Sequence, residues 1–385
     1  MSIEFTNDSP GVSDVPGFRV GAAGCDIRNK STDRLDLTLV VADRPCAAAG
    51  VFTTNDVKAA PVRFCQQVLA VSADQIRGII GNSGNANACT AAQGDADAVA
   101  MAKLSAAAVG APDDAFLVCS TGRIGELLPM AKVAEGIKVS ASRLSRDAAE
   151  GVRSANAILT SDTRPKSVTI AGIAKGAGMI EPNMATMLAF VCTDAAASPA
   201  ELKAALKASS DQSFNCVSVD GDMSTNDTVL LLASGVSGVS VGASAPAALR
   251  ALFQEALDKV CFALAEKIVG DGEKITKVVA VEIEGARTRA DAEKIARAIG
   301  NSLLVKSSWY GEDPNWGRLA DAAGYARTGL DESKLDIYYD DVPAVLGGKP
   351  LPENKPRWKQ VVKAARFAVR LKLNLGDAKF RLLAA

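Results

Sequence analysis

One hydroxyl group in this sequence follows a glycine-rich stretch, at a place where a catalytic nucleophile could act. Residues 175–188 read Lys-Gly-Ala-Gly-Met-Ile-Glu-Pro-Asn-Met-Ala-Thr-Met-Leu, and an apolar, strand-like tract covers 184–191. A loop would therefore deliver the Thr186 hydroxyl to the mouth of a buried strand, where rigid structure fixes the side chain and the loop leaves access for a substrate. The alternative is that Thr186 is an ordinary β-branched strand residue.

The absence of histidine limits the chemistry that such a nucleophile can use. None of the 385 residues is histidine, which excludes Ser-His-Asp triads, Cys-His dyads and metal sites built on imidazole. The base for acyl transfer would then have to be a carboxylate or an amine. A free α-amino group, with an ordinary pKa of about 7.7–8.0, could accept a proton near neutral pH.

The composition predicts a cytoplasmic protein that binds neither nucleic acid nor a membrane surface. The eight cysteines form no C-x-x-C pair and mostly lie in apolar stretches, so we expect buried free thiols and no metal site. The net charge is −1 and no basic cluster is present, which argues against nucleic acid or an anionic membrane as a partner. No apolar run approaches the roughly 18 residues of a membrane span, and residues 1–16 have neither signal-peptide nor transit-peptide character.

The segments that would position Thr186 mix strands and helices along the whole chain. Apolar runs predict strands at 35–41, 47–52, 75–80, 116–119, 168–173, 184–192, 216–219, 228–233, 276–283 and 302–305. Amphipathic or alanine-rich patterns predict helices at 94–110, 130–138, 146–158, 199–209, 245–269, 289–299 and 315–325. The Asn/Gly tract 81–87 between two of these segments is either a plain turn or a polar loop beside a substrate.

This order of segments predicts an α/β protein with layered mixed sheets and a second, smaller α/β domain. Several strands are adjacent and few clean βαβ units occur, which argues against a dinucleotide-binding fold. Neither G-x-G-x-x-G nor a Walker A string is present, so we expect no bound cofactor. The length predicts two units, and the change of character near Gly272 places them at 1–271 and 272–385.

Several motifs together resemble one enzyme family over about residues 15–385. They are Lys175–Ile180 with Pro182–Leu188, Gly50–Asn55, Gly81–Asn87, Ser120–Gly125, Asp220–Asp227 and Asp313–Arg318. The chain is similar to the ornithine acetyltransferases, also called glutamate N-acetyltransferases, and the implied fold is the layered architecture of the ornithine acetyltransferase and DmpA type. The resemblance implies that the chain cuts itself between Ala185 and Thr186 into chains 1–185 and 186–385. These would assemble as an α2β2 heterotetramer.

The resemblance also implies a role for each site residue. Thr186 would be the nucleophile, and its new α-amine would act as the base. The hydroxyl of Thr121 and the backbone N–H of Gly122 would stabilise the oxyanion. Thr160, Lys175, Thr186 and Glu273 would bind substrate, with Lys175 facing a carboxylate and Glu273 the ornithine side-chain ammonium.

The implied activity is transfer of an acetyl group from N2-acetylornithine to glutamate in arginine biosynthesis. A bifunctional enzyme would also use acetyl-CoA as a co-substrate, and these residues leave that alternative open. Two other readings are a self-cleaving aminopeptidase or amidohydrolase of similar fold, and a non-catalytic binding protein. The retained Thr186, Thr121 and Gly122 argue against the last reading. One departure concerns the end of the sequence, Leu383-Ala384-Ala385. The family pattern continues there into a strand and a tail that contact substrate, so we expect an effect on substrate affinity.

Overall fold

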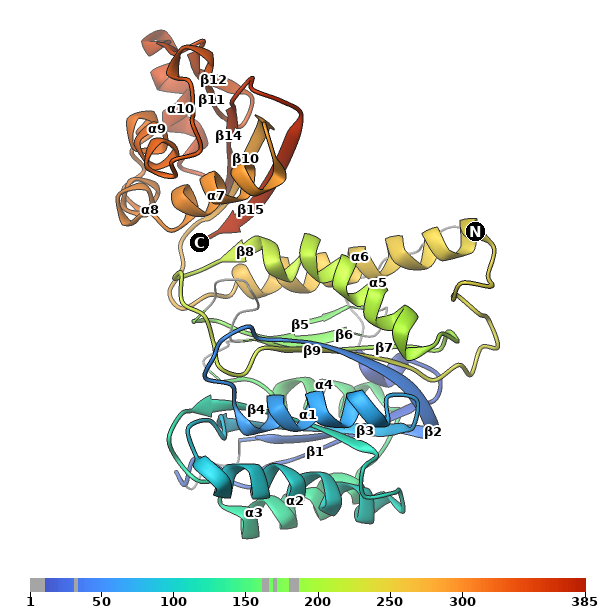
Figure 1. Ribbon diagram of the computed structural model, residues 1–385. Coiled ribbons are helices and arrows are strands. Elements are labelled where there is room, and N and C mark those ends of the chain that lie inside the picture. The colour runs from blue at the N-terminus through green and yellow to red at the C-terminus, as the bar shows by residue number, and fades with distance from the viewer. Residues whose placement is uncertain (1–10, 31–33, 161–165, 169–171, 180–186) are drawn as a thin grey trace. The chain divides into compact units, whose positions relative to one another are not determined.

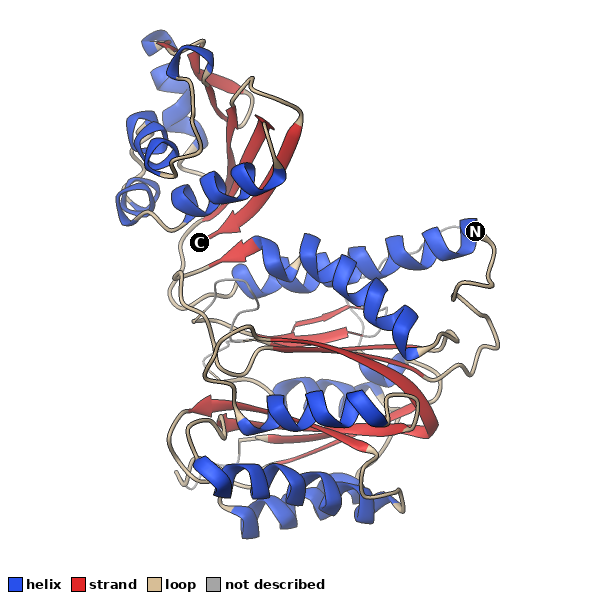
Figure 2. Cartoon of the chain, viewed as in Figure 1, coloured by secondary structure: helices blue, strands red, loops and turns tan. Residues whose placement is uncertain are grey.

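The chain forms two compact units, each with its own sheet (Figure 1, Figure 2). The computed structural model describes residues 11–30, 34–160, 166–168, 172–179 and 187–385. The larger unit comprises Met1–Asn215 and Asp222–Ile268, and the smaller unit comprises Cys216–Gly221 and Val269–Ala385. The sequence placed 216–221 in the larger domain. This segment joins the smaller unit instead, because β8 (Val217–Ser218) pairs in parallel with β15 (Ala378–Ala384).

In the described part of the chain, the larger unit is built on an eight-stranded sheet in the order β4-β3-β2-β9-β7-β6-β5, with β1 paired to β2. The long strand β2 pairs with β3 through most of its first half and with β9 through its second half, so it joins two layers of strands (Figure 2). Parallel and antiparallel pairs both occur, which confirms the predicted mixed-sheet α/β class. The strands are β1 (Phe18–Ala23), β2 (Leu37–Phe52), β3 (Ile76–Asn85), β4 (Phe116–Arg123), β5 (Lys166–Val168), β6 (Gly172–Lys175), β7 (Leu188–Thr193) and β9 (Thr228–Ala233).

Helices pack on both faces of these strands and between the two layers (Figure 1). On one side α2 and α3 bury Met101 and Ile137 against Leu39 of β2. Between the layers, α1 and α4 contribute Cys65 and Ile158, just after α4, to a core that also holds Phe190 of β7. The helices are α1 (Ala60–Val71), α2 (Ala91–Val109), α3 (Met130–Ser142), α4 (Ala148–Ala157), α5 (Pro199–Gln212) and α6 (Ala247–Val269).

Two expected breaks in the strands are absent. The strands predicted at 35–41 and 47–52 are one continuous strand, β2. Pro45, which we interpreted as a break, lies where the register with β3 shifts between Val41 and Cys46, and proline is tolerated at such a bulge because it has no amide hydrogen to pair. The Asn/Gly tract 81–87 likewise continues β3 as far as Asn85, because β3 pairs in parallel with β4 up to that point.

The smaller unit has a seven-stranded sheet in the order β13-β12-β11-β14-β10-β15-β8. Its core packs Ile295 of α7 and Leu319 of α9 against Val281 of β10. The strand predicted at 302–305 is wrong: Ser302 accepts a hydrogen bond from the Val305 N–H and caps a helix. The remaining elements are β10 (Val278–Ala286), β11 (Asp336–Tyr339), β12 (Val342–Leu346), β13 (Lys349–Pro350), β14 (Arg366–Lys372), α7 (Arg289–Gly300), α8 (Leu303–Tyr310), α9 (Trp316–Tyr325) and α10 (Lys355–Val361).

Candidate active site

Lys175 brings three of the predicted site residues together. It ends β6 and is 1% exposed. Its Nζ donates hydrogen bonds to Thr160 Oγ1 at 2.9 Å and to Thr121 Oγ1 at 3.3 Å. These residues come from three separate segments, namely β6, the turn after α4, and β4. Because an ammonium group can only donate, the Thr121 oxygen accepts this bond and keeps its own O–H proton for another acceptor.

The sequence led us to expect Gly122 just beyond the end of a strand, but the residue lies within β4. The strand continues to Arg123, and Gly122 is paired with Gly84 of β3. Its φ is 137°. A Cβ at this position would lie 2.2 Å from the carbonyl carbon of Gly84. Only glycine fits this close approach of two strands, which also fixes the backbone next to the Thr121 hydroxyl.

The turn that carries Thr160 is held in place from two directions. Arg34 Nη2 donates to the carbonyl oxygens of Leu159 and Thr160, at 2.9 Å and 2.8 Å. The preceding helix α4 is anchored to β1 by Glu150, whose Oε1 accepts the Ala22 N–H at 2.8 Å. Hydrogen bonds to a charged carboxylate are stronger than neutral ones, so this contact ties α4 firmly to β1. The position of the Thr160 hydroxyl therefore follows from contacts outside the site.

Buried amides connect the polar motifs that surround these residues. Asn226 Nδ2 donates to the carbonyl oxygens of Ala86 and Ser120, at 2.7 Å and 2.9 Å. Thr53 Oγ1 donates to the carbonyl oxygen of Ser224 at 2.8 Å. The sequence placed all of these in matching motifs without assigning them roles. In the structure they join four segments that are far apart in the sequence and so maintain the shape of the site.

Asp227 is a site residue that the sequence analysis did not identify. It is completely buried, and its Oδ1 accepts the backbone N–H of Met187 at 3.0 Å. Burial raises the pKa of this carboxyl above its ordinary value, while the Met187 N–H, the Ser224 side chain and the charge of Lys175 act in the opposite direction. Its motif, Asp220–Asp227, was noted in the sequence, but nothing there distinguished this aspartate from Asp220 and Asp222.

Thr186 and Ala185, the predicted nucleophile and the residue before the cut, lie outside the described residues. The described chain resumes at Met187, whose carbonyl oxygen accepts the Thr228 N–H at 3.1 Å. Glu273, predicted to bind the ornithine side chain, is exposed on a turn of the smaller unit.

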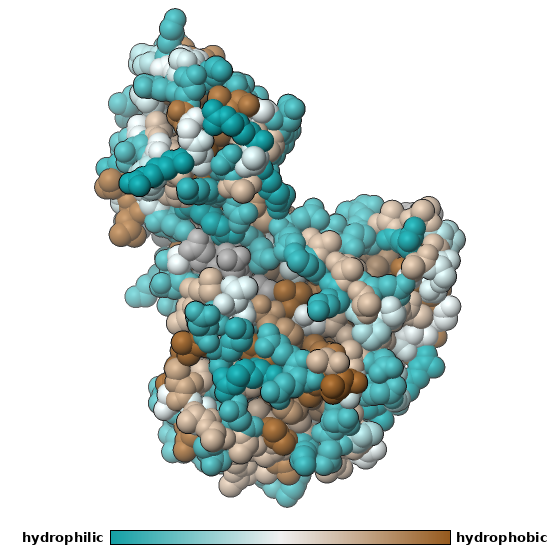
Figure 3. Space-filling view, in the orientation of Figure 1, coloured by the Kyte–Doolittle hydropathy of each residue, from teal (hydrophilic) through white to brown (hydrophobic). Residues whose placement is uncertain are grey.

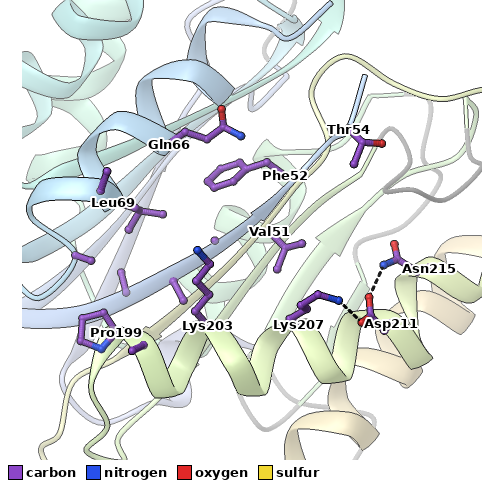
Figure 4. A pocket seen from close by; sticks show the side chains of 16 residues that line it. Val51, Phe52, Thr54, Gln66, Leu69, Pro199, Lys203, Lys207, Asp211 and Asn215 are labelled. Atoms are coloured by element: carbon purple, nitrogen blue, oxygen red, sulfur yellow. Dashed lines mark hydrogen bonds and ion pairs between the residues drawn. The ribbon is translucent and has the colours of Figure 1, made fainter. Parts of the chain in front are cut away.

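A cavity of about 710 Å³ lies elsewhere in the larger unit, between α1, α5 and the second half of β2 (Figure 4). None of the predicted site residues lines it. Phe52 and Leu69 form part of its apolar wall, and Lys203 and Lys207 project from α5. Lys207 pairs with Asp211 of the same helix. The cavity is therefore a feature separate from the candidate active site.

The cysteines are free thiols, and most of them are buried, as predicted. Burial raises the pKa of Cys46 to about 12, so that this thiol stays protonated and unreactive near neutral pH. In the described part of the chain, no group of three or more cysteine and acidic side chains is arranged to hold a metal ion.

Hydrophilic residues cover much of the face shown in Figure 3, with apolar patches between them. The helices among the described residues include none that is both long and apolar enough to cross a membrane.

Known proteins of one family match nearly the whole of this sequence. The model of the ArgJ family matches residues 19–385. The arginine biosynthesis bifunctional protein ArgJ of Symbiobacterium thermophilum is 42% identical over 380 residues, which cover 96% of this chain and 93% of that protein. The glutamate N-acetyltransferase of Methanopyrus kandleri is 41% identical over 354 residues, which cover 89% of this chain and 90% of that protein.

Two solved structures are also similar. The ArgJ protein from Bacillus halodurans is 33% identical with a TM-score of 0.49, covering 51% of this chain and 92% of that one. The ornithine acetyltransferase from Mycobacterium tuberculosis, solved with ornithine, is 37% identical with a TM-score of 0.43, covering 46% of this chain and 97% of that one.

Proposed function

Since the chain belongs to the ArgJ family, we propose that it transfers an acetyl group from N2-acetylornithine to glutamate through an acetyl-Thr186 intermediate. The enzyme would act in arginine biosynthesis, on small-molecule substrates. The observation that carries the proposal is the contact of the buried Lys175 ammonium with both Thr121 and Thr160. This arrangement provides a cation for a substrate carboxylate and a threonine hydroxyl whose proton is free to be donated.

The enzyme first matures by cutting its own chain. The Thr186 hydroxyl attacks the carbonyl carbon of Ala185, and the peptide bond becomes an ester with a free α-amine on Thr186. Water then hydrolyses the ester, which leaves a carboxylate on Ala185 and restores the Thr186 hydroxyl. The product has an amine and a hydroxyl on the same residue, so that the amine can remove the hydroxyl proton during catalysis.

Acetyl transfer then proceeds in two half-reactions. The Thr186 oxygen attacks the acetyl carbonyl of acetylornithine while the α-amine takes its proton. The tetrahedral oxyanion accepts hydrogen bonds from the Thr121 hydroxyl and the Gly122 N–H. Collapse of this intermediate breaks the amide bond, and the proton passes to the leaving ornithine amine. The amine of glutamate next attacks the acetyl ester by the same route and regenerates the Thr186 hydroxyl.

Lys175 serves both half-reactions. Lys175 is 1% exposed. A buried ammonium group attracts a substrate carboxylate more strongly than a solvent-exposed ammonium group does. Its hydrogen bond to Thr121 Oγ1 draws electron density from that oxygen and makes the hydroxyl a better donor to the oxyanion. Thr160 fixes the direction of the ammonium.

The finer features of the proposal rest on family membership. Glu273 would hold the ornithine side-chain ammonium, and the cleaved chains would assemble as α2β2 in the cytoplasm. Acetyl-CoA would serve as an additional acetyl donor if the enzyme is bifunctional, and no bound cofactor would be required.

Supplying the purified protein with acetylornithine, with and without glutamate, tests the proposed function. We expect formation of acetylglutamate and ornithine in equal amounts. A self-cleaving aminopeptidase would instead release amines from small peptide amides to water, and glutamate would not affect its rate. That second result would overturn the proposal.

A further inference from the structure

The second half of β2 has an open edge, with no strand beside it among the described residues. β2 pairs with β3 only as far as Cys46. From Ala47 to Phe52 it pairs with β9, along its other edge. This segment reads Ala-Ala-Ala-Gly-Val-Phe and contains neither a charged residue nor a proline. Such residues usually protect an open edge, because its backbone groups are a template for another strand.

The alternation along β2 shows which backbone groups point to the open edge. The Thr53 N–H donates at 3.1 Å to the carbonyl oxygen of the residue just before β9, in register with the β2–β9 pairs. Odd-numbered residues of this segment therefore bond to β9, and even-numbered residues point away from it. Ala48 follows this rule, because its N–H donates to the Ala73 carbonyl oxygen at 2.7 Å. The N–H and carbonyl groups of Gly50 and Phe52 point the same way and have no hydrogen-bond partner in the described chain.

The open edge lies in the cavity of about 710 Å³ between α1 and α5, and Gly50 and Phe52 both line this cavity. Gly50, Val51 and Phe52 are only partly buried. Figure 4 shows α1 on one side of this part of β2 and α5 on the other. The volume is within the usual range for ligand sites. Donors and acceptors of the backbone are therefore accessible to a ligand in this cavity.

The two sides of the cavity differ in chemistry. On the α1 side, Phe52 and Leu69 pack against the apolar core between the strand layers. On the α5 side, Lys203 and Lys207 project from the helix toward β2. Lys207 pairs with Asp211, whereas Lys203 is exposed and forms no ion pair with a described residue. The first side suits apolar groups, and the second suits carboxylates.

We propose that the open edge of β2 binds an extended segment of a partner protein in which apolar and acidic residues alternate. The bound segment adds a strand to the sheet and exchanges hydrogen bonds with the backbone of Gly50 and Phe52. Successive side chains of a strand point to opposite faces. The apolar side chains of the segment therefore contact Phe52 and Leu69, and its carboxylates face Lys203 and Lys207. This inference goes beyond acetyl transfer and does not depend on it.

Charge argues against a second copy of this chain as the occupant. Pairing two copies edge to edge would bring the same stretch, Ala47–Phe52, onto the open edge, and this stretch has no acidic residue to meet Lys203. It would also bring the lysines of the two α5 helices closer together, and like charges repel. A partner with carboxylates avoids both costs.

Binding of a synthetic peptide tests the proposal without an activity assay. The probe is a fluorescently labelled peptide of three Val-Glu repeats, and its anisotropy is measured with the purified protein at low and high salt. We expect saturable binding that weakens with salt, because salt screens exposed charges. One control peptide has Val-Lys repeats. The other has Val-Glu repeats with every internal amide N-methylated, so it keeps the side chains but cannot donate to a neighbouring strand. We expect both to bind at least about tenfold more weakly.

Variants of the protein locate the site. Phe52→Pro and Phe52→Ala both lose the ring, but only Phe52→Pro loses an N–H of the open edge, where proline is tolerated. We expect Phe52→Pro to bind the Val-Glu peptide about twofold to tenfold more weakly than Phe52→Ala. Lys203→Glu should weaken binding by about twofold to tenfold at low salt. Lys359→Glu is the control, because Lys359 is an exposed lysine on α10 of the smaller unit, and it should bind as the parent does.

Several results would overturn the proposal. An N-methylated peptide that binds as tightly as the unmodified one would rule out strand addition, and equal binding of the Val-Lys peptide would rule out the role of the lysines. No binding of the Val-Glu peptide at about 1 mM would rule out the site. If Phe52→Pro but not Phe52→Ala lowers the number of copies in the native complex, measured by sedimentation, a second copy occupies the edge. If Phe52→Pro does not fold, the control peptides and Lys203→Glu decide the matter.

Discussion

At the scale of single residues, the site depends on whether the Thr121 hydroxyl can still donate its proton in a hydrogen bond to the substrate. Lys175 occupies the acceptor side of the Thr121 hydroxyl and leaves its proton available. Without the lysine, the substrate would have to both donate a hydrogen bond to the Thr121 oxygen and accept one from the Thr121 O–H. The arrangement therefore explains why a buried cation lies at this place, where its desolvation would otherwise be a pure cost.

Removal of the Thr121 hydroxyl should slow acetyl transfer with little change in fold. We expect Thr121→Ala to lower kcat by about 10²–10³-fold, the usual loss for one oxyanion donor. Thr121→Ser retains the hydroxyl and should recover a large part of this loss. Assays of both variants at saturating acetylornithine and glutamate would measure the effect. If Thr121→Ala turned over at the rate of the parent, Thr121 would only be a strand residue that accepts from Lys175.

At the scale of elements, Glu150 fixes helix α4 against β1. The turn that follows α4 carries Thr160 into the site. Glu150 Oε2 also pairs with Arg143 Nη2 at 2.9 Å, in addition to the Ala22 contact of Oε1. Burial alone would raise the pKa of Glu150, but the Arg143 guanidinium and the Ala22 N–H outweigh it and hold the pKa below the ordinary 4.5. The carboxylate is therefore stabilised in its charged form by the fold.

Glu150→Gln should lower stability in a manner that depends on pH. The pKa of Glu150 is depressed in the folded state, so its contribution is fully present above pH 4.5 and is lost as the pH falls through the folded-state value. We expect the variant to be less stable than the parent by about 1–3 kcal/mol near neutral pH, and this difference to shrink in acid. Urea unfolding at several pH values measures it. A difference that is constant with pH would contradict the role of the charge.

The elements also show what the sequence could and could not predict. Helices with a local signal at their start were predicted, such as α5, which begins at Pro199. The structure adds a capping box there, formed by Ser198 and Glu201. The strand predicted at 302–305 is wrong, because Ser302 caps a helix that begins at Leu303. β2 continues past Pro45 because its pairing with β3 shifts register there and accommodates a bulge. The sequence of β2 alone does not show that β3 allows this bulge.

The site was predictable only as a set of motifs. Thr121 and Lys175 are 54 residues apart in sequence, and nothing local to either residue states that they touch. Family resemblance supplied their roles as expectations, and the fold supplies their contact. Asp227 was missed because its complete burial and its contact with the Met187 N–H are determined only by tertiary structure.

At the scale of the whole molecule, the two expected chains are interleaved in one sheet. In the order β2-β9-β7-β6, the two central strands β9 and β7 follow position 186, and the strands on either side of them, β2 and β6, precede it. β6 pairs with β7, and β2 pairs with β9. A cut between Ala185 and Thr186 would therefore leave both chains hydrogen-bonded to each other through two strand pairs.

This interleaving predicts different results under denaturing and native conditions. We expect denaturing mass spectrometry of the purified protein to give two species, corresponding to residues 1–185 and 186–385. Size-exclusion chromatography in native buffer should give one peak that contains both. Two separate native peaks would contradict the shared sheet, whereas a single full-length mass in a fully matured sample would contradict self-cleavage. Thr186→Ala, which lacks the hydroxyl, should remain full length and provides the control.

The most direct test of the central claim is the mass of the protein after mixing with acetylornithine in the absence of glutamate. The account predicts one added acetyl group on the chain that begins at Thr186, and its loss when glutamate is added. Thr186→Ala should acquire no acetyl group. If no acetyl-enzyme forms and acetyl transfer requires both substrates to be bound together, the Thr186 mechanism is wrong.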